Sequence, residues 1–211
     1  MDSYQIIHYP DLSTNADAIQ YFWHMLPYAV PGFITFLCGL ILSLIGLFRV
    51  FSRTEKTGYY LSFSGMCLGF GMLGFVLGLR SVIQDTDILL KWNTYLYPIV
   101  LLFAPSSAHL IYYILDKKYK IALIGAVINW IATLFAFYGI ITNSAFTGKF
   151  LHYSFGIYPI ASIYLKPWGI VGAATFFLLG VPVYIHYIKR HSFYEKRFLV
   201  IGHILSILLV I

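Results

Sequence analysis

Runs of about twenty consecutive apolar residues recur along this chain of 211 residues. A helix of that length crosses the roughly 30 Å hydrocarbon core of a lipid bilayer. Hydrophobic residues make up 60% of the sequence and charged residues only 10%, whereas soluble domains carry roughly 25% charged residues. One soluble core cannot bury this much apolar surface. The chain is therefore predicted to be an all-α integral membrane protein.

The breaks between the apolar runs predict a bundle of six transmembrane helices. They cover residues 25–51, 59–79, 95–115, 121–142, 167–188 and 198–211. The last run rises only about 21 Å before the sequence stops, so this helix is expected to be truncated and the parent protein to be longer. Residues 1–24 lack the basic start and apolar core of a signal peptide and are predicted to be an extracytoplasmic segment. Residues 25–211 are predicted to form one multi-pass domain, incomplete at its C-terminal end.

Positive charges predict the orientation of this bundle. The loops after the first, third and fifth spans hold ten of the 14 Lys and Arg residues. The positive-inside rule places these loops in the cytoplasm and the N-terminus outside. The net charge of +6 is explained by these loops, so the expected partner is the lipid bilayer and no nucleic acid.

Recognisable chemical motifs are missing from the sequence. It has no phosphate-binding loop, no metal-ligand spacing and no nucleophile elbow, so no catalytic residue, metal or cofactor is expected. Cys38 and Cys67 lie inside apolar runs and are interpreted as small apolar residues. The second span contains two pairs of glycines four residues apart, Gly65 with Gly69 and Gly74 with Gly78. This spacing favours close packing of helices and leaves a homodimer as a lesser alternative.

Three polar residues inside the predicted spans are candidates for ligand binding or signal relay: His109, Asn129 and His203. Polar groups are costly in lipid and usually face the interior of a bundle. Each lies roughly 9 to 12 Å from the cytoplasmic end of its span, so one polar layer is expected. The layer would either satisfy neighbouring helices or carry a signal, and both interpretations stay open. Pro98 and Pro105 are expected to distort the third span and free carbonyl groups for such partners.

The segment from 143 to 166 is predicted to be a long outer loop, because Gly148 and Gly156 break regular structure. Its many aromatic residues suggest either a lid over the outer mouth of the bundle or a segment in the membrane interface. His152 and Tyr158 are the ligand candidates in this loop.

Several of these features occur together in one family. The third span contains Ala-Pro-Ser-Ser-Ala-His at 104–109, and a basic inner loop leads into Glu-Lys-Arg-Phe-Leu-Val-Ile-Gly-His at 195–203. With the external N-terminus and the long outer loop, the chain from about Met25 resembles the N-terminal seven-transmembrane sensor region of bacterial histidine kinases, nucleotide cyclases and serine phosphatases. The resemblance implies a seventh helix beyond Ile211, a C-terminal cytoplasmic signalling domain and a bacterial cytoplasmic membrane.

The resemblance implies that the chain is a sensory input domain for an unknown small-molecule or membrane-borne ligand. A transporter or channel module is the alternative, which should show an internal repeat or a pair of broken helices. An intramembrane enzyme is a third possibility, but it would need acids, histidines or a nucleophile at one depth. The six predicted spans contain no acidic residue.

Overall fold

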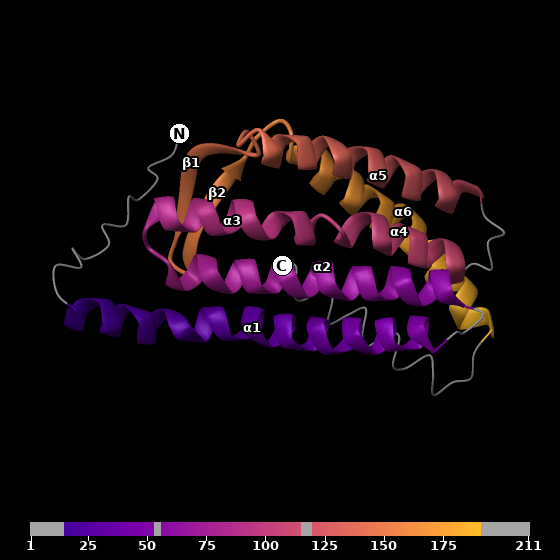
Figure 1. The fold of residues 1–211 in the computed structure, drawn as a ribbon, viewed down its shortest axis with the longest axis horizontal. Helices are drawn as coiled ribbons and strands as arrows, with labels where there is room; N and C mark the ends of the chain where they lie inside the picture. The colour runs from indigo at the N-terminus through magenta and orange to yellow at the C-terminus, as the bar shows by residue number, and fades with distance from the viewer. Residues whose placement is uncertain (1–14, 53–55, 115–119, 191–211) are drawn as a thin grey trace.

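The computed structural model describes residues 15–52, 56–114 and 120–190. This part of the chain is mostly helical. Its elements are α1 (Asn15–Phe51), α2 (Thr57–Val82), α3 (Thr86–Val100), α4 (Phe103–Ile114), α5 (Lys120–Ile141), β1 (Phe146–Tyr153), β2 (Gly156–Ala161) and α6 (Lys166–Arg190). Figure 1 shows the helices lying side by side, with the two strands crossing one end of the bundle. We call this end, where α2 finishes and α3 begins, the hairpin end.

Four helical stretches are long and apolar enough to cross a membrane. They are Ile19–Phe51, Thr57–Val82, Thr86–Ile114 and Lys120–Ile141. Helix α1 begins at Asn15 rather than at residue 25, and its first turns extend past the other helices (Figure 1). The sixth predicted span, residues 198–211, lies outside the described residues, so the total of six or seven spans stays a prediction.

The packing differs from that in a water-soluble bundle, because many buried positions hold alanine and many large apolar residues face outward. The buried positions include Ala29, Ala104, Ala108, Ala122, Ala126 and Ala136. Exposed positions include Ile41, Leu44, Phe48, Ile124, Ile131 and Leu134. Lipid tails accept such a surface, and small interior residues let helix backbones approach one another.

Helices α1 and α2 touch backbone to backbone along a row of glycines, which we call the glycine seam (Gly32 and Gly39 of α1, Gly71 and Gly74 of α2). A Cβ atom added to Gly39 would lie 2.6 Å from the Cys67 carbonyl oxygen. One added to Gly74 would lie 2.8 Å from the Gly32 carbonyl oxygen. The predicted close packing of the two glycine pairs is therefore found within one chain, with Gly74 and Gly78 against α1 and Gly65 and Gly69 against α4.

A pair of serines continues this interface. Ser64 Oγ donates a hydrogen bond of 2.8 Å to the Ser43 carbonyl oxygen, and the two hydroxyl groups lie 2.8 Å apart. On its other side α2 packs equally closely on α4, where a Cβ atom on Gly69 would lie 2.6 Å from the Phe103 nitrogen. Helix α2 is thus the centre of the packing.

The third span is broken between α3 and α4, at Leu101 and Leu102, which we call the α3–α4 joint. Pro105 has no N–H group, so the Leu101 carbonyl lacks its usual helical donor. The indole N–H of Trp168, in the first turns of α6, donates a hydrogen bond of 3.2 Å to that carbonyl. The predicted distortion and freed carbonyl are found at Pro105, but not at Pro98, which lies within the continuous helix α3, and the carbonyl is bound by Trp168 instead of a member of the expected polar layer. The predicted start of this span at residue 95 is wrong, because α3 begins at Thr86.

The prediction of an irregular outer loop is also wrong, because residues 146–161 form an antiparallel β-hairpin. The fold is therefore not entirely helical. The register shifts between Phe146 and Phe150, and Gly148 has a φ angle of 75° inside this bulge. Gly148 was predicted to break regular structure. It instead allows the bulge in β1, because a bulge position with positive φ favours glycine.

Candidate functional site at the hairpin end

Arg80 lies in the last turn of α2 and is only 7% exposed. Its Nε and Nη2 atoms donate to Asn93 Oδ1 at 3.0 and 2.7 Å, and Nη2 also donates to the Tyr97 hydroxyl at 3.0 Å. We call these three side chains the Arg80 network. All hydrogen-bond partners of Arg80 in the described part of the chain are neutral. Buried cations are normally paired with an acid, so this arginine is the strongest candidate for a functional group.

The start of α3 positions the two partners of Arg80. The Asp85 carboxylate caps the helix by accepting hydrogen bonds of 2.9 Å from two backbone N–H groups of the first turn. A helix beginning there carries Asn93 and Tyr97 on one face, because residues four apart are neighbours on a helix. Asn93 Nδ2 donates to the Leu89 carbonyl oxygen at 2.7 Å, which leaves Oδ1 to face Arg80.

The hairpin closes over this network. Gly156 meets the end of α2 so closely that an added Cβ atom would lie 2.6 Å from the Arg80 carbonyl oxygen. The Arg80 Cζ atom lies 5.3 Å from the centre of the Tyr158 ring and 5.8 Å from that of Tyr97. Aromatic faces attract a cation, so both rings compensate part of the arginine's charge. Burial raises the pKa of the Tyr158 phenol, and the Arg80 charge only partly opposes this shift. The phenol is therefore neutral at physiological pH.

Phe146 connects the hairpin to the core of the bundle. Its ring packs edge-on against Tyr97, with the ring centres 5.1 Å apart and the planes at 89°. Tyr97 belongs to a buried cluster that also contains Leu101 and Leu165 and packs against Trp168. The Arg80 network is therefore joined by continuous side-chain packing to the α3–α4 joint.

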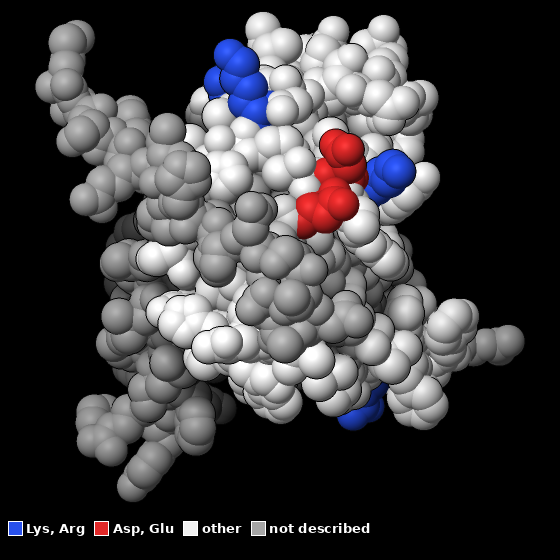
Figure 2. All heavy atoms as spheres, turned by 90° about the vertical axis from the view of Figure 1, so that its left-hand side faces the viewer, with Lys and Arg blue, Asp and Glu red and all other residues white. Residues whose placement is uncertain are grey.

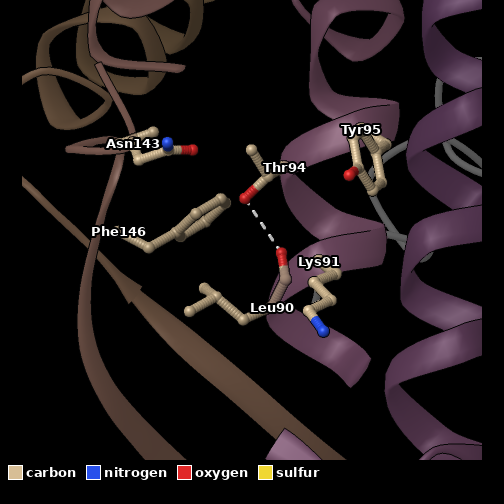
Figure 3. A pocket seen from close by; sticks show the side chains of 7 residues that line it. Leu90, Lys91, Thr94, Tyr95, Asn143 and Phe146 are labelled. Atoms are coloured by element: carbon tan, nitrogen blue, oxygen red, sulfur yellow. Dashed lines mark hydrogen bonds between the residues drawn. The ribbon is translucent and has the colours of Figure 1, made fainter. Parts of the chain in front are cut away.

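A cleft of about 260 Å³ lies between α3 and the segment that enters β1. It is lined by Leu90, Lys91, Thr94, Tyr95, Asn143, Ala145 and Phe146. Figure 3 shows Phe146 pointing toward Thr94, whose hydroxyl donates to the Leu90 carbonyl oxygen at 2.9 Å. Since Phe146 also contacts Tyr97, the cleft and the Arg80 network share one wall.

Acidic residues at this end stay on the surface. Figure 2, which looks onto the hairpin end, shows the acidic side chains in one patch, with a basic group beside it. Asp85 and Asp87 are both exposed at the turn between α2 and α3, where Asp85 is used to cap α3. Neither is hydrogen-bonded to Arg80, so the guanidinium has no acidic hydrogen-bond partner in the described part of the chain.

The polar layer expected in the inner half of the bundle is not formed between His109 and Asn129. His109 Nδ1 accepts a hydrogen bond of 3.2 Å from the Trp130 indole on the partly exposed seam between α4 and α5. Asn129 is fully buried and donates to the Gly125 carbonyl at 2.8 Å and to the Thr175 hydroxyl of α6 at 2.7 Å. Positions 129 and 130 point about 100° apart because they are consecutive on a helix. Each polar group therefore has a different partner helix.

The structure separates the remaining candidates. Tyr158 is brought to the Arg80 network, whereas His152 lies exposed on β1. His203 lies outside the described residues. Within the three described ranges, no group of three or more His, Cys, Asp and Glu side chains is arranged to hold a metal ion.

Sequence reasoning missed Arg80 and Asn93 as site residues. Arg80 was counted with the loop charges, although it follows directly on an apolar run and has no charged neighbour before Asp85. The basic residues of the loops after the first, third and fifth spans occur in clusters, whereas Arg80 stands alone at the end of an apolar run. An isolated arginine at the end of a span was the available signal.

The chain matches no protein-family model, no curated protein and no solved structure. The resemblance to the seven-transmembrane sensor region therefore remains an expectation based on the residues quoted for it.

Proposed function

We propose that this chain is the membrane-embedded sensory input domain of a signalling protein, and that the signal is received at the hairpin end. Arg80 supports this most directly. It is a buried cation with neutral partners, and the hairpin that covers it links α5 to α6. Charged groups inside membrane bundles are costly and usually functional. The clustering of basic residues at the other end favours a hairpin end outside the cytoplasm, where external signals arrive.

Packing beneath the hairpin supports a route for transmission. Phe146 touches Tyr97, Tyr97 shares a buried cluster with Leu101, and Trp168 is hydrogen-bonded to the Leu101 carbonyl. We infer that the α3–α4 joint is the element whose geometry changes, because one of its carbonyl groups is held by a side chain instead of a helical N–H. The proposed cytoplasmic output domain would then respond to movement at the end opposite the hairpin.

The broken helix also favours a second candidate, a transporter or channel module, because such proteins build substrate sites from discontinuous helices. Here the freed Leu101 carbonyl is occupied by Trp168 instead of being open to an ion. Among the described helices, α1 contains Pro27 and Pro31 but is continuous, so it does not provide a matching break. The sensor is therefore the preferred proposal.

The test measures whether a change at the hairpin end moves the opposite end. Spin labels are attached to cysteines at Lys56 and Lys120, two exposed positions at the starts of α2 and α5. Cys38 and Cys67 are first replaced by Ala. Arg80→Gln then removes the buried charge. The sensor proposal expects the distance between the labels to change by about 2 Å or more, the scale of helix shifts in switching proteins.

Lys149→Gln is the matched control, because it removes an exposed charge from the same hairpin. Gly156→Ala is a second perturbation that displaces the hairpin without changing any charge. An unchanged distance in folded Arg80→Gln and Gly156→Ala proteins would contradict transmission. Uptake of acetate or chloride into proteoliposomes would instead favour the transporter or channel.

A further inference from the structure

The geometry points to Arg80 as the binding site for a small oxyanion, a carboxylate or phosphate group, which displaces the Tyr158 ring and with it the hairpin. This inference rests on the proposed function and names the class of ligand received at the hairpin end. Three observations support it: Arg80 and Tyr97 have unused hydrogen-bond donors, the Arg80 charge has no acidic hydrogen-bond partner in the described residues, and the Tyr158 ring lies over the guanidinium.

Hydrogen-bond donors remain in excess around Arg80. A guanidinium group has five N–H donors. Three of them are used, because Nε and Nη2 donate to Asn93 and Nη2 also donates to Tyr97. The two N–H groups of Nη1 have no acceptor in the described part of the chain. Tyr97 accepts through its oxygen, which leaves its hydroxyl hydrogen free to donate.

The acceptors of the site are already occupied. Asn93 Oδ1 receives two hydrogen bonds from Arg80, and the Leu89 carbonyl receives the Asn93 amide. A site with spare donors, occupied acceptors and a net positive charge is complementary to an anion. The planar fork of arginine matches the two oxygens of a carboxylate or phosphate better than a spherical ion.

Tyr158 acts as the temporary cover of this charge. Its neutral ring lies 5.3 Å from the Arg80 Cζ atom, and a ring face stabilises a cation less than an oxyanion in direct contact does. Tyr158 is only half-buried and its ring lies over Arg80, which is 7% exposed, so in this proposal the anion takes the place of the ring against the guanidinium. Tyr158 and Gly156 belong to the same strand, so this displacement lifts the hairpin from the end of α2.

The experiment is equilibrium dialysis of the purified chain against radiolabelled acetate or orthophosphate at constant ionic strength. We expect saturable binding by the wild-type chain. The affinity of Arg80→Gln for the anion should be lower by a factor of roughly ten or more, because a hydrogen-bonded charge is lost. Lys149→Gln, on the same hairpin, is expected to bind like the wild type. Tyr97→Phe keeps the charge and the ring, and is expected to weaken binding by a smaller factor. It serves as the test if Arg80→Gln does not fold.

Two membrane mimetics identify the source of the oxyanion. Binding both in maltoside micelles and in phosphatidylcholine nanodiscs supports a free anion as the ligand. Binding in micelles alone supports a lipid headgroup phosphate that occupies the site in the bilayer. Bound anion should also speed protease cleavage of the hairpin. The inference is overturned if the folded wild-type chain shows no saturable binding, or if folded Arg80→Gln and Tyr97→Phe bind as tightly as the wild type.

The label distance between positions 56 and 120, recorded in the same samples, separates this inference from the proposed function. Anion binding that leaves the distance unchanged would contradict transmission and keep the anion site. If the wild-type chain binds no anion but the label distance still changes in Arg80→Gln, the anion site is contradicted and the sensor proposal is kept.

Discussion

The indole N–H of Trp168 donates a hydrogen bond of 3.2 Å to the carbonyl oxygen of Leu101, the group that Pro105 leaves without a helical donor. A side chain from α6 therefore replaces a backbone group of the third span. The break between α3 and α4 is thereby fastened to the helix that follows the hairpin.

Trp168→Phe tests this fastening. Loss of the indole N–H leaves the Leu101 carbonyl unsatisfied, so the free energy of unfolding should fall by about 1 kcal/mol. In a Pro105→Ala background the same substitution should cost less, because the alanine that replaces the proline supplies a helical N–H to that carbonyl. Unfolding by SDS titration measures both. An equal loss in the two backgrounds would show that the tryptophan stabilises the protein through ring packing alone.

Gly156→Ala tests the contact between the hairpin and α2. The added Cβ atom would lie 2.6 Å from the Arg80 carbonyl, and the φ angle of 151° is strained for any other residue. We expect a lower melting temperature and faster protease cleavage within the hairpin. Gly169→Ala is the control, because a Cβ atom there meets nothing within 4 Å and Ala favours a helix. Equal protease resistance of Gly156→Ala and the wild type would refute the close contact.

Substitutions of Thr133 and Asn129, which lie about one turn apart on α5, are expected to have opposite effects on the free energy of unfolding. The Thr133 hydroxyl is buried and has no hydrogen-bond partner in the described part of the chain. Thr133→Val should therefore leave the free energy of unfolding unchanged or raise it. Asn129→Ala removes the hydrogen bonds to Gly125 and Thr175, and should lower the free energy of unfolding by about 1 kcal/mol or more. A clear loss of stability in Thr133→Val would point to a bound partner at that hydroxyl.

Cysteine labelling in intact cells tests the proposed orientation. Leu151 lies exposed on β1, whereas Lys56 and Lys120 lie at the starts of α2 and α5. A membrane-impermeant reagent added from outside should label a cysteine at 151 and fail at 56 and 120. Labelling of position 120 from outside would show that the orientation is the opposite one, with the hairpin end in the cytoplasm.

The helices could be predicted because the signal is local. An apolar run long enough to cross a bilayer can be recognised without knowing its neighbours, so the positions of α2 and α5 follow from their own residues. The distortion near Pro105 was predictable for the same reason, since a proline removes its own N–H. Its partner was not predictable, because Trp168 reaches Leu101 only once α6 is packed against α4.

The site could not be predicted because it depends on distant contacts. Whether Arg80 is a surface charge or a buried one is decided by α3 on one side and by the hairpin above it. The hairpin was not predicted because its glycines are typical of irregular loops. Gly148 and Gly156 suggested an irregular loop, yet one shapes a bulge and the other allows a close approach to α2.

The glycine seam limits which positions of this sequence can be substituted during evolution. Side chains of α1 and α2 that face lipid can exchange among Leu, Ile and Phe at little cost, because lipid offers no complementary shape. Gly39 and Gly74 have no such freedom, since any larger side chain would have to push two backbones apart. Descendants of this chain should therefore diverge fastest on their outer surface and keep small residues along the seam.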